Sequence, residues 1–295
     1  MKTISTYKFM KHYLLILLLS FLFRSTLSQT LSKEYVSDAG CDTLSKNATF
    51  KIYIKATNNA LHGDSILAIK LFNDYIKIDS TCSSAYLNLG IAYVKCKNYN
   101  QALQCFLKSK DLNNKEFRAW FNIGFIYWNQ NRFAKAIEYF NEAVLINPGH
   151  AKSYYYRGNT YASLKKYELA LKDFNKAIEL NDKDADSYKD RGVIYSQTNQ
   201  LELALKDYKI AYQLDPESHL LNSAIAIALF KTNQIDSALY HIHYLQRNSD
   251  DYRFDMLAAY CYLKKNDRLN ACLNYKKARH KGQDEELDEF KTLCK

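Results

Sequence analysis

Residues that could carry out chemistry are sparse in this sequence. His241 and His243 could suggest a shared metal ion, but residues two apart on a helix point to different faces and chelate poorly. There is no glycine loop to cradle a phosphate, no nucleophile elbow and no HExxH motif, and the carboxylates are scattered. The sequence therefore predicts a protein that is not an enzyme and that uses no metal, no cofactor and no small-molecule substrate.

Cysteines are the other reactive side chains. The chain has seven, and an odd number leaves at least one free thiol. No two of them have CxxC spacing, so zinc and redox motifs of that type are absent. We expect Cys96, Cys105 and Cys261, which occur at helical positions, to be small buried apolar side chains.

Half of the glycines recur at a fixed interval. Gly90, Gly124, Gly158 and Gly192 are each 34 residues apart, in a chain with only eight glycines. A fixed period of roughly 20 to 50 residues is typical of repeat proteins. The scarcity of glycine and proline also favours a chain that is helical almost throughout.

Residue types at other positions of the 34-residue repeat recur as well. When each unit is counted from seven residues before its glycine, aromatic residues recur at positions 4, 11 and 24, and alanine recurs at position 20. Positions 4, 7, 8 and 11 share a stripe of a first helix, and positions 20, 24 and 27 share a stripe of a second. We predict that small residues let the two helices cross closely. The alanines are Ala102, Ala136, Ala170 and Ala204.

This pattern resembles the tetratricopeptide repeat, a helix–turn–helix unit of 34 residues. The resemblance implies an all-α fold, a right-handed α-solenoid of about seven repeats followed by a C-terminal capping helix at 286–295. A segment at 29–48 precedes the array, which spans 49–285. The predicted repeats are 49–82, 83–116, 117–150, 151–184, 185–218, 219–251 and 252–285.

Two repeats depart from the pattern in a correlated way. Arg157 and Arg191 occupy position 7, where other repeats have an apolar residue, and the same repeats carry Asp173 and Asp207 at position 23. An arginine at the seam between two helices is costly unless it is paired. We predict the ion pairs Arg157–Asp173 and Arg191–Asp207, with ligand binding by the arginines as the alternative.

The repeat boundaries also suggest two disulfides. Cys272 falls in the second helix of the last repeat and Cys294 ends the capping helix that should fold back on it, so this pair is favoured. Closing such a loop stabilises a fold by on the order of 3 kcal/mol. Cys41 with Cys82 is a weaker prediction, which would tie the leading segment to the first repeat.

Residues 1–28 have the features of a secretory signal peptide. A basic start is followed by the apolar run Tyr13–Phe23 and then by small and polar residues. The run is shorter than the roughly 20 residues that span a membrane. We expect a secreted, periplasmic or envelope-associated protein after cleavage near Ser28, with an uncleaved anchor as the alternative. A cut at Ser28–Gln29 resembles exported proteins of Bacteroidetes-type bacteria.

The charge of the remaining chain argues against nucleic acid as a partner. Cleavage would leave 37 basic and 31 acidic residues, a net charge of +6. The basic residues are scattered among acidic ones, which is typical of a solvated surface rather than a nucleic-acid footprint.

The resemblance also implies where a partner would bind. In tetratricopeptide-repeat proteins, positions 2, 5, 9 and 12 of the first helices face the concave side, where partners are usually peptides or protein segments. Large apolar residues there indicate an interaction site; cover by segment 29–48, by the superhelix itself or by a second copy is the alternative. Carried onto this chain, the groove residues include Leu87, Ile91, Phe121, Phe125, Trp128, Lys152, Tyr155, Asn159 and Lys189.

These features lead to two hypotheses for function. The first is a non-enzymatic scaffold that binds a peptide or protein segment in its concave groove. The second is a structural or self-associating envelope component without a transient ligand, so a homo-oligomer stays open. Some family members clamp the acidic tails of chaperones, but the lysine at position 5 and the arginine at position 6 of that clamp are missing here in the register required.

Overall fold

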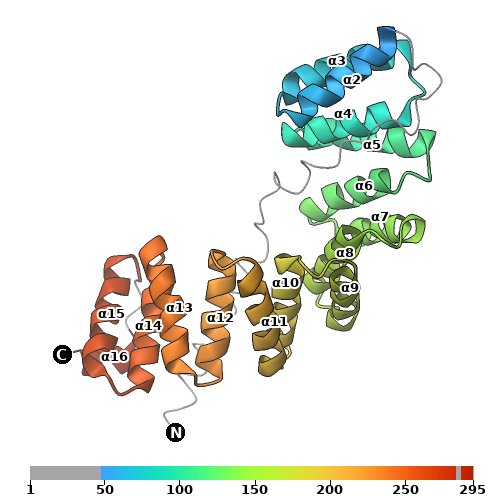
Figure 1. Cartoon of the computed structure of the whole chain (residues 1–295). Coiled ribbons are helices and arrows are strands. Elements are labelled where there is room, and N and C mark those ends of the chain that lie inside the picture. Colours follow the sequence, from blue (N-terminus) through green and yellow to red (C-terminus); the bar gives the residue numbers. More distant parts are fainter. Residues whose placement is uncertain (1–47, 284–286, 295) are drawn as a thin grey trace. The chain divides into compact units, whose positions relative to one another are not determined.

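The computed structural model describes residues 48–283 and 287–294, and in these residues every regular element is an α-helix (Figure 1). The fold is therefore the predicted all-α class, an α-solenoid of helix hairpins. The predicted signal peptide 1–28, the segment before residue 48 and Cys41 lie outside the described residues. Within the described part, none of the helices has the length and apolar character that a membrane span needs.

The helices follow the period of the sequence. The first helices of the hairpins are α2 (Ala48–Leu61), α4 (Ser83–Lys95), α6 (Phe117–Asn129), α8 (Ala151–Ser163), α10 (Ala185–Gln197), α12 (His219–Lys231) and α14 (Tyr252–Lys264). The second helices are α3 (Ser65–Ile78), α5 (Tyr99–Leu112), α7 (Phe133–Ile146), α9 (Tyr167–Leu180), α11 (Leu201–Leu214), α13 (Ile235–Asn248) and α15 (Arg268–His280). The short helix α16 (Asp288–Leu293) follows them.

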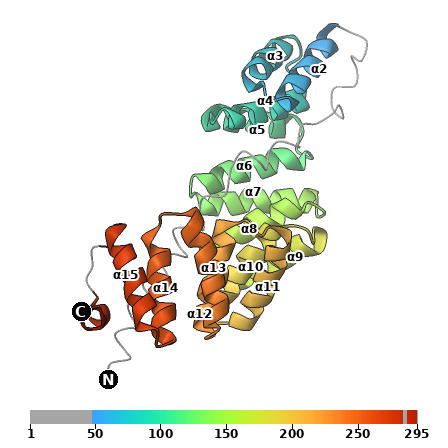
Figure 2. The same ribbon diagram turned by 60° about the vertical axis from the view of Figure 1, so that its left-hand side comes forward.

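The described residues fall into two units. In the unit from residue 48 to 181, α2 packs on α3, α4 on α5, α6 on α7 and α8 on α9. Within this unit α3 also packs on α4, α5 on α6 and α7 on α8, so the hairpins follow one another in chain order (Figure 1, Figure 2). In the unit from residue 182 to 294, α10 packs on α11, α12 on α13 and α14 on α15.

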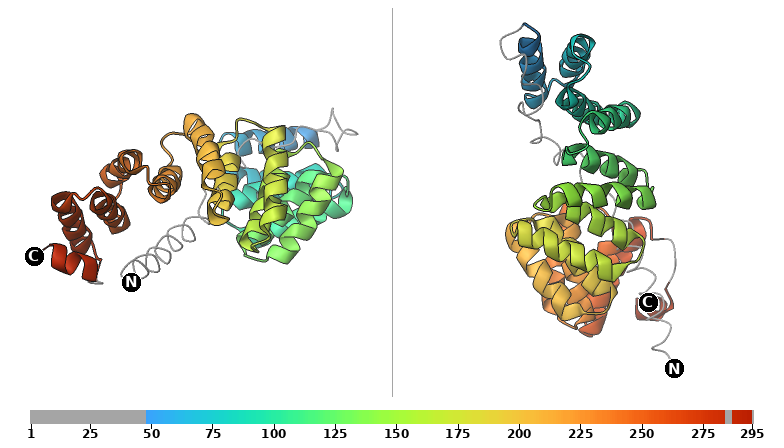
Figure 3. Two further views of the ribbon diagram at one scale, coloured as in Figure 1. Left: turned by 90° about the horizontal axis from the view of Figure 1, so that it is seen from below. Right: turned by 90° about the vertical axis from the view of Figure 1, so that its right-hand side faces the viewer.

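The C-terminal end of the second unit is closed by α16, which packs against α15 (Figure 3). The ring of Phe290 stacks on that of Tyr275 at a centroid distance of 4.5 Å, and Phe290 is fully buried. A disulfide joins Cys272 of α15 to Cys294, with a Cα–Cα distance of 5.3 Å. The capping helix is thus attached both by packing and covalently.

The recurring glycines lie where the two helices of a hairpin cross. A Cβ atom on Gly90 would come 2.5 Å from the Phe106 ring, and one on Gly192 would come 2.6 Å from the Tyr208 ring. The alanines at position 20, Ala102, Ala136, Ala170 and Ala204, are completely buried. The fixed spacing of these glycines is therefore a consequence of helix packing. An aromatic ring of the second helix occupies the space that a side chain at the glycine position would need.

The turn inside each hairpin contains a left-handed residue. Lys97 and Lys165 have φ angles of 61° and 57°, and asparagine occupies the equivalent position in four other turns. The N–H of the next residue then donates to a carbonyl of the first helix, as from Asn98 to Tyr93 at 2.9 Å. This is the Schellman closure of a helix end, which usually has glycine at the left-handed position.

We expect the variant Lys97→Gly, Lys165→Gly to be more stable than the natural chain. Residues with a Cβ atom are strained in the left-handed region, and glycine is not. Each substitution should raise the free energy of unfolding by about 0.5–1 kcal/mol, measured by urea denaturation. Gly63 already has a positive φ of 95° in the first hairpin, so Gly63→Lys should have the opposite effect. A decrease in stability on introducing glycine would contradict this account of the turns.

Candidate functional site

The two arginines at position 7 each form a two-pronged ion pair across their hairpin. Arg157 Nε and Nη2 donate to Asp173 at 2.8 and 2.7 Å, joining α8 to α9. Arg191 makes the same two bonds to Asp207, both at 2.7 Å, joining α10 to α11. Both carboxylates are buried. Hydrogen bonding to Asp207 raises the pKa of Arg191, although burial opposes this. These guanidinium groups are engaged within the fold, which favours the structural interpretation.

We call the predicted groove residues of α4, α6 and α8 the first-helix face: Leu87, Ile91, Phe121, Phe125, Trp128, Lys152, Tyr155 and Asn159. Its apolar part does not form the exposed surface that the sequence predicted. Leu87 and Ile91 are 0% exposed, and Phe121 and Phe125 are 2% and 3% exposed. All four belong to one hydrophobic cluster that includes Phe106 and Phe140 of the second helices. The alternative, cover by segment 29–48, by the superhelix itself or by a second copy, stays a prediction.

A residue that the sequence analysis missed organises the aromatic part of this face. Tyr156 of α8 is buried, and its ring lies 5.0 Å from Phe125, 5.3 Å from Trp128 and 5.7 Å from Phe121. It also contacts Tyr155 at 5.0 Å. The only hint in the sequence is the run of three tyrosines at 154–156. Through Tyr156, α8 extends the cluster that α6 begins.

Two buried polar atoms of α6 have no hydrogen-bond partner within the described part of the chain. They are Asn122 Oδ1, an acceptor, and the indole Nε1 of Trp128, a donor. Asn122 is 1% exposed, and its Nδ2 donates to the carbonyl of Arg118 at 2.8 Å, which fixes the direction of its side chain. A buried polar group left unpaired costs about 1–3 kcal/mol, so such atoms are usually paired. Satisfying them requires a donor at Asn122 Oδ1 and an acceptor at Trp128 Nε1.

The polar predicted residues lie farther along the row of first helices. Lys152, Tyr155 and Asn159 are half-buried on α8, where Asn159 Nδ2 donates to the Tyr155 carbonyl at 3.3 Å. All three take part in further interactions. They therefore continue the first-helix face with a more polar surface than α6 offers.

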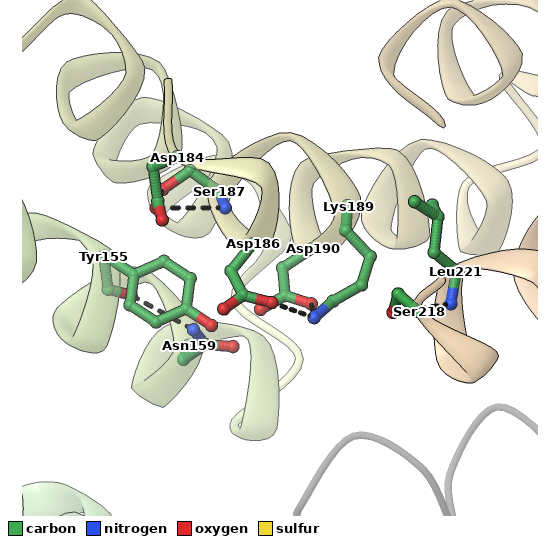
Figure 4. A network of polar contacts seen from close by, with 9 residues as sticks. All are labelled: Tyr155, Asn159, Asp184, Asp186, Ser187, Lys189, Asp190, Ser218 and Leu221. Atoms are coloured by element: carbon green, nitrogen blue, oxygen red, sulfur yellow. Dashed lines mark hydrogen bonds and ion pairs between the residues drawn. The ribbon is translucent and has the colours of Figure 1, made fainter. Parts of the chain in front are cut away.

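Lys189 of α10 is held by carboxylates in the second unit (Figure 4). Its Nζ pairs with Asp186 Oδ1 and lies 3.8 Å from Asp190 Oδ1. Burial would lower the pKa of Lys189, but the charges of Asp190 and Asp186 outweigh it and raise the pKa above its ordinary value. Nearby, the Ser187 hydroxyl and backbone N–H donate to Asp184, whose pKa is raised by burial. Lys189 thus remains charged and paired near neutral pH.

The two histidines with a metal-like spacing contact different helices. His241 Nδ1 lies 2.8 Å from Asn222 Oδ1 of α12, and His243 Nε2 lies 3.3 Å from the Tyr262 hydroxyl of α14. Within the described residues, no group of three or more histidine, cysteine or acidic side chains is arranged to hold a metal. His241 thus contacts the other helix of its own hairpin, and His243 contacts the next hairpin of the second unit.

These histidines predict loss of stability in mild acid. Burial lowers the pKa of His241 and of His243 below that of an unfolded histidine, about 6.5. Protonation then favours the unfolded chain. The contribution of the neutral imidazoles to the free energy of unfolding is therefore complete above the unfolded pKa and is lost as the pH falls from there toward the lower pKa of the folded state. The free energy of unfolding should fall between about pH 7 and 5, and the variant His241→Gln should show a shallower decline. An identical pH profile for the variant would contradict this assignment.

The thiols have no reactive arrangement. Cys96, Cys105 and Cys261 are free, and burial raises the pKa of Cys105 and of Cys261 to about 12. A thiol with such a pKa is almost entirely protonated near neutral pH and is a poor nucleophile. Cys261 is buried as predicted, whereas Cys96 and Cys105 are half-buried, so the prediction of burial is wrong for these two. Cys82, at the start of α4, is disulfide-bonded, and its predicted partner Cys41 lies outside the described residues.

The fold is a stack of helix hairpins in which a glycine of the first helix recurs against an aromatic ring of the second. This arrangement defines a helical-repeat protein. Sequence profiles described as tetratricopeptide repeat match residues 83–116, 117–150, 151–184 and 174–206. Residues 83–206 are therefore similar to the tetratricopeptide repeat. In this family the fold typically serves as a non-enzymatic scaffold for protein interaction.

Solved structures share this fold. A tetratricopeptide-repeat protein from Parabacteroides merdae is 19% identical, with a TM-score of 0.59 over 83% of this chain and 97% of that one. PilF of Pseudomonas aeruginosa is 16% identical, with a TM-score of 0.62 over 72% and 96%. YrrB, described as having an unusual peptide-binding site, is 18% identical, with a TM-score of 0.53 over 66% and 97%. Likeness at these identities shows the fold alone. Curated protein sequences give no match.

Proposed function

We propose that this protein is a non-enzymatic scaffold that holds an extended polypeptide segment against the first-helix face. The observation that carries this proposal is the pair of unpartnered atoms on α6, Asn122 Oδ1 and Trp128 Nε1. An extended backbone presents N–H donors and C=O acceptors along its whole length, so one segment could satisfy both atoms. The hydrogen bonds would recover the free energy that the buried unpaired atoms cost.

The surroundings of these atoms suit a polypeptide better than a small polar ligand. Phe121, Phe125 and Tyr156 form a rigid aromatic wall beside Trp128. Tryptophan and tyrosine are the side chains that contribute most often to the centre of protein interfaces. The half-buried polar residues of α8 would contact the segment farther along. The fold that the chain shares with YrrB is compatible with such a role.

We also propose that the protein is exported. The pattern of residues 1–28 supports this, and the Cys272–Cys294 disulfide fits an oxidising compartment. Mass spectrometry of the intact protein from its natural host should give a chain that begins near Gln29. A mass that includes residues 1–28 would instead support the uncleaved anchor.

Peptide display tests the binding proposal. A library of random 12-residue peptides would be selected on the full chain, and the affinities of selected peptides would then be measured for two variants. Asn122→Ala removes the acceptor, and Trp128→Phe removes the N–H while keeping a ring. Each should weaken binding about tenfold, because one hydrogen bond to a buried partner is worth about 1.4 kcal/mol.

Two control variants match these substitutions. Trp120→Phe changes the other tryptophan, whose Nε1 already donates to the Asn114 carbonyl at 2.9 Å. Asn248→Ala removes an exposed asparagine that makes the same bond to a carbonyl four residues earlier, at 2.8 Å. Both controls should keep the natural affinity. Selected peptides that bind all four variants equally would refute the proposed face. A stable oligomer in light scattering that shields Trp128 would support the structural alternative.

A further inference from the structure

We propose that a group of tyrosine and histidine side chains on α11 and α13 is a second binding site, and that its ligand is a neutral glycan. The group consists of Tyr212, Tyr240, His241 and Tyr244, and we call it the tyrosine cluster. All four residues belong to the unit from residue 182 to 294. The cluster shares no residue with the first-helix face, so the inference goes beyond the proposed function.

The side chains of the tyrosine cluster are accessible from outside. Tyr240 is 66% exposed, and Tyr212, His241 and Tyr244 are half-buried. Tyr240 and Tyr244 are four residues apart and therefore lie on the same face of α13. Large aromatic side chains that gather on an exposed surface usually mark a place where another molecule binds.

Contacts among the rings fix their positions. The imidazole of His241 lies 5.3 Å from the Tyr212 ring and 5.2 Å from the Tyr240 ring, and both contacts are edge-to-face. The Tyr244 hydroxyl donates to the Glu217 carbonyl at 3.1 Å. A ligand would therefore meet a surface that is already arranged, with rings from two helices that belong to neighbouring hairpins.

His241 adds a hydrogen-bond acceptor to this surface. Asn222 Nδ2 donates to the carbonyls of Pro216 and Ser218, both at 3.0 Å, so the atom that lies 2.8 Å from His241 Nδ1 is Asn222 Oδ1. Because Oδ1 only accepts, Nδ1 carries the proton, and Nε2 of the neutral imidazole is the acceptor. In the part of the chain that the structure describes, no group donates to Nε2, which leaves it available to a ligand hydroxyl.

The tyrosine cluster is uncharged near neutral pH. Burial lowers the pKa of His241, so its imidazole is neutral. Burial, followed by the effects of Tyr240 and Tyr244, raises the pKa of Tyr212 above the ordinary value of about 10, so its hydroxyl stays protonated. The cluster thus offers ring surfaces, hydroxyl groups and one imidazole acceptor, but no charge that would attract an ionic ligand.

A neutral glycan has the complementary chemistry. The faces of a sugar ring carry C–H groups, which pack favourably on the negative face of an aromatic ring such as Tyr240. Its rim carries hydroxyls, and each of them both donates and accepts, as the tyrosine hydroxyls do. A sugar hydroxyl can therefore donate to His241 Nε2 while its neighbours bond to the tyrosine hydroxyls. A peptide backbone has fewer hydrogen-bonding groups over the same small area.

A glycan array tests the class of ligand. The full chain, carrying a fluorescent label, would be applied to printed neutral, sialylated and sulfated glycans. We expect neutral glycans to give the strongest signals. An array on which no glycan is bound, or on which only sialylated and sulfated glycans are bound, would overturn the inference.

Variants of the tyrosine cluster test its location. Isothermal titration calorimetry would give the affinity for the neutral glycan that the array ranks first. Tyr240→Ala removes an exposed ring and should weaken binding at least tenfold, and Tyr212→Phe removes a hydroxyl and should weaken it several-fold. Tyr167→Ala, which changes a half-buried tyrosine at the start of α9, is the control and should keep the natural affinity. If both cluster variants bind as tightly as the natural chain, the inference is wrong.

The imidazole of His241 gives a readout that a structural role alone would not change. In nitrogen-15 spectra of the full chain, the Nε2 resonance of His241 should shift on addition of the same glycan, because this nitrogen then accepts a hydrogen bond. The Tyr240→Ala chain should show a smaller shift at the same glycan concentration. A resonance that does not move at saturating glycan would contradict the assigned role of His241 and place the glycan outside the cluster.

Discussion

Replacing Asp207 by alanine is expected to lower the free energy of unfolding by about 3–5 kcal/mol, the cost of leaving a buried charge without its partner. Arg191 donates two hydrogen bonds to this carboxylate, which is 3% exposed, and the arginine itself is largely enclosed between α10 and α11. Without Asp207 the guanidinium would have to remain desolvated or leave the seam. Urea denaturation followed by circular dichroism would measure the change.

The double variant Arg191→Met, Asp207→Leu is the matched control. Removing both charges and filling the space with apolar atoms is often neutral or even stabilising, because no desolvated charge remains. We therefore expect it to recover most of the stability that Asp207→Ala loses. If Asp207→Ala unfolds at the same urea concentration as the natural chain, the pair is not the buried link between helices that we describe. Asp173→Ala should behave like Asp207→Ala.

Substituting Gly90 by alanine should destabilise the fold by about 1–3 kcal/mol, the usual cost of forcing extra atoms into a packed core. The new Cβ would lie 2.5 Å from Phe106, whose ring is completely buried and cannot move freely. Alanine is favoured over glycine in a helix by about 1 kcal/mol, so the clash must exceed that gain to have this effect. Thermal and urea unfolding would both report it.

The four glycines provide their own control series. The distance from an added Cβ to the facing ring is 2.5 Å at Gly90, 2.6 Å at Gly192, 2.9 Å at Gly124 and 3.2 Å at Gly158. We expect alanine to cost most at Gly90 and Gly192 and least at Gly158, where the gain in helix propensity could cancel the strain. A series in which Gly158→Ala is the most damaging would show that the helix crossings do not limit packing in this way.

The repeat architecture could be predicted because the same residue types recur at the same positions of successive repeats. Gly90 with Ala102, and Arg191 with Asp207, are pairs whose positions recur, and a recurring pair indicates a recurring contact. In the structure these residues lie at hairpin crossings, with Arg191 bound to Asp207. The Cys272–Cys294 disulfide followed from the same logic, since a capping helix must return to the last repeat.

The candidate site could be predicted only in part. The resemblance indicates which helix face a partner would use, but it does not tell what covers Leu87 or Phe121, because burial depends on every neighbour in space. Tyr156 was missed because its contacts to α6 cross a repeat boundary. The unpaired state of Asn122 Oδ1 likewise emerges only from the full set of hydrogen bonds. The left-handed turns at Lys97 and Lys165 carry no glycine that would have marked them.

The most direct test of the central claim is the hydrogen exchange of the Trp128 indole N–H. The chain has two tryptophans, so Trp120→Phe leaves Trp128 as the single indole signal in a nitrogen-15 spectrum. If the first-helix face binds a polypeptide, a bound display-selected peptide should slow the exchange of this N–H relative to the free chain. An exchange rate that is the same in the free and in the peptide-bound chain would contradict the account.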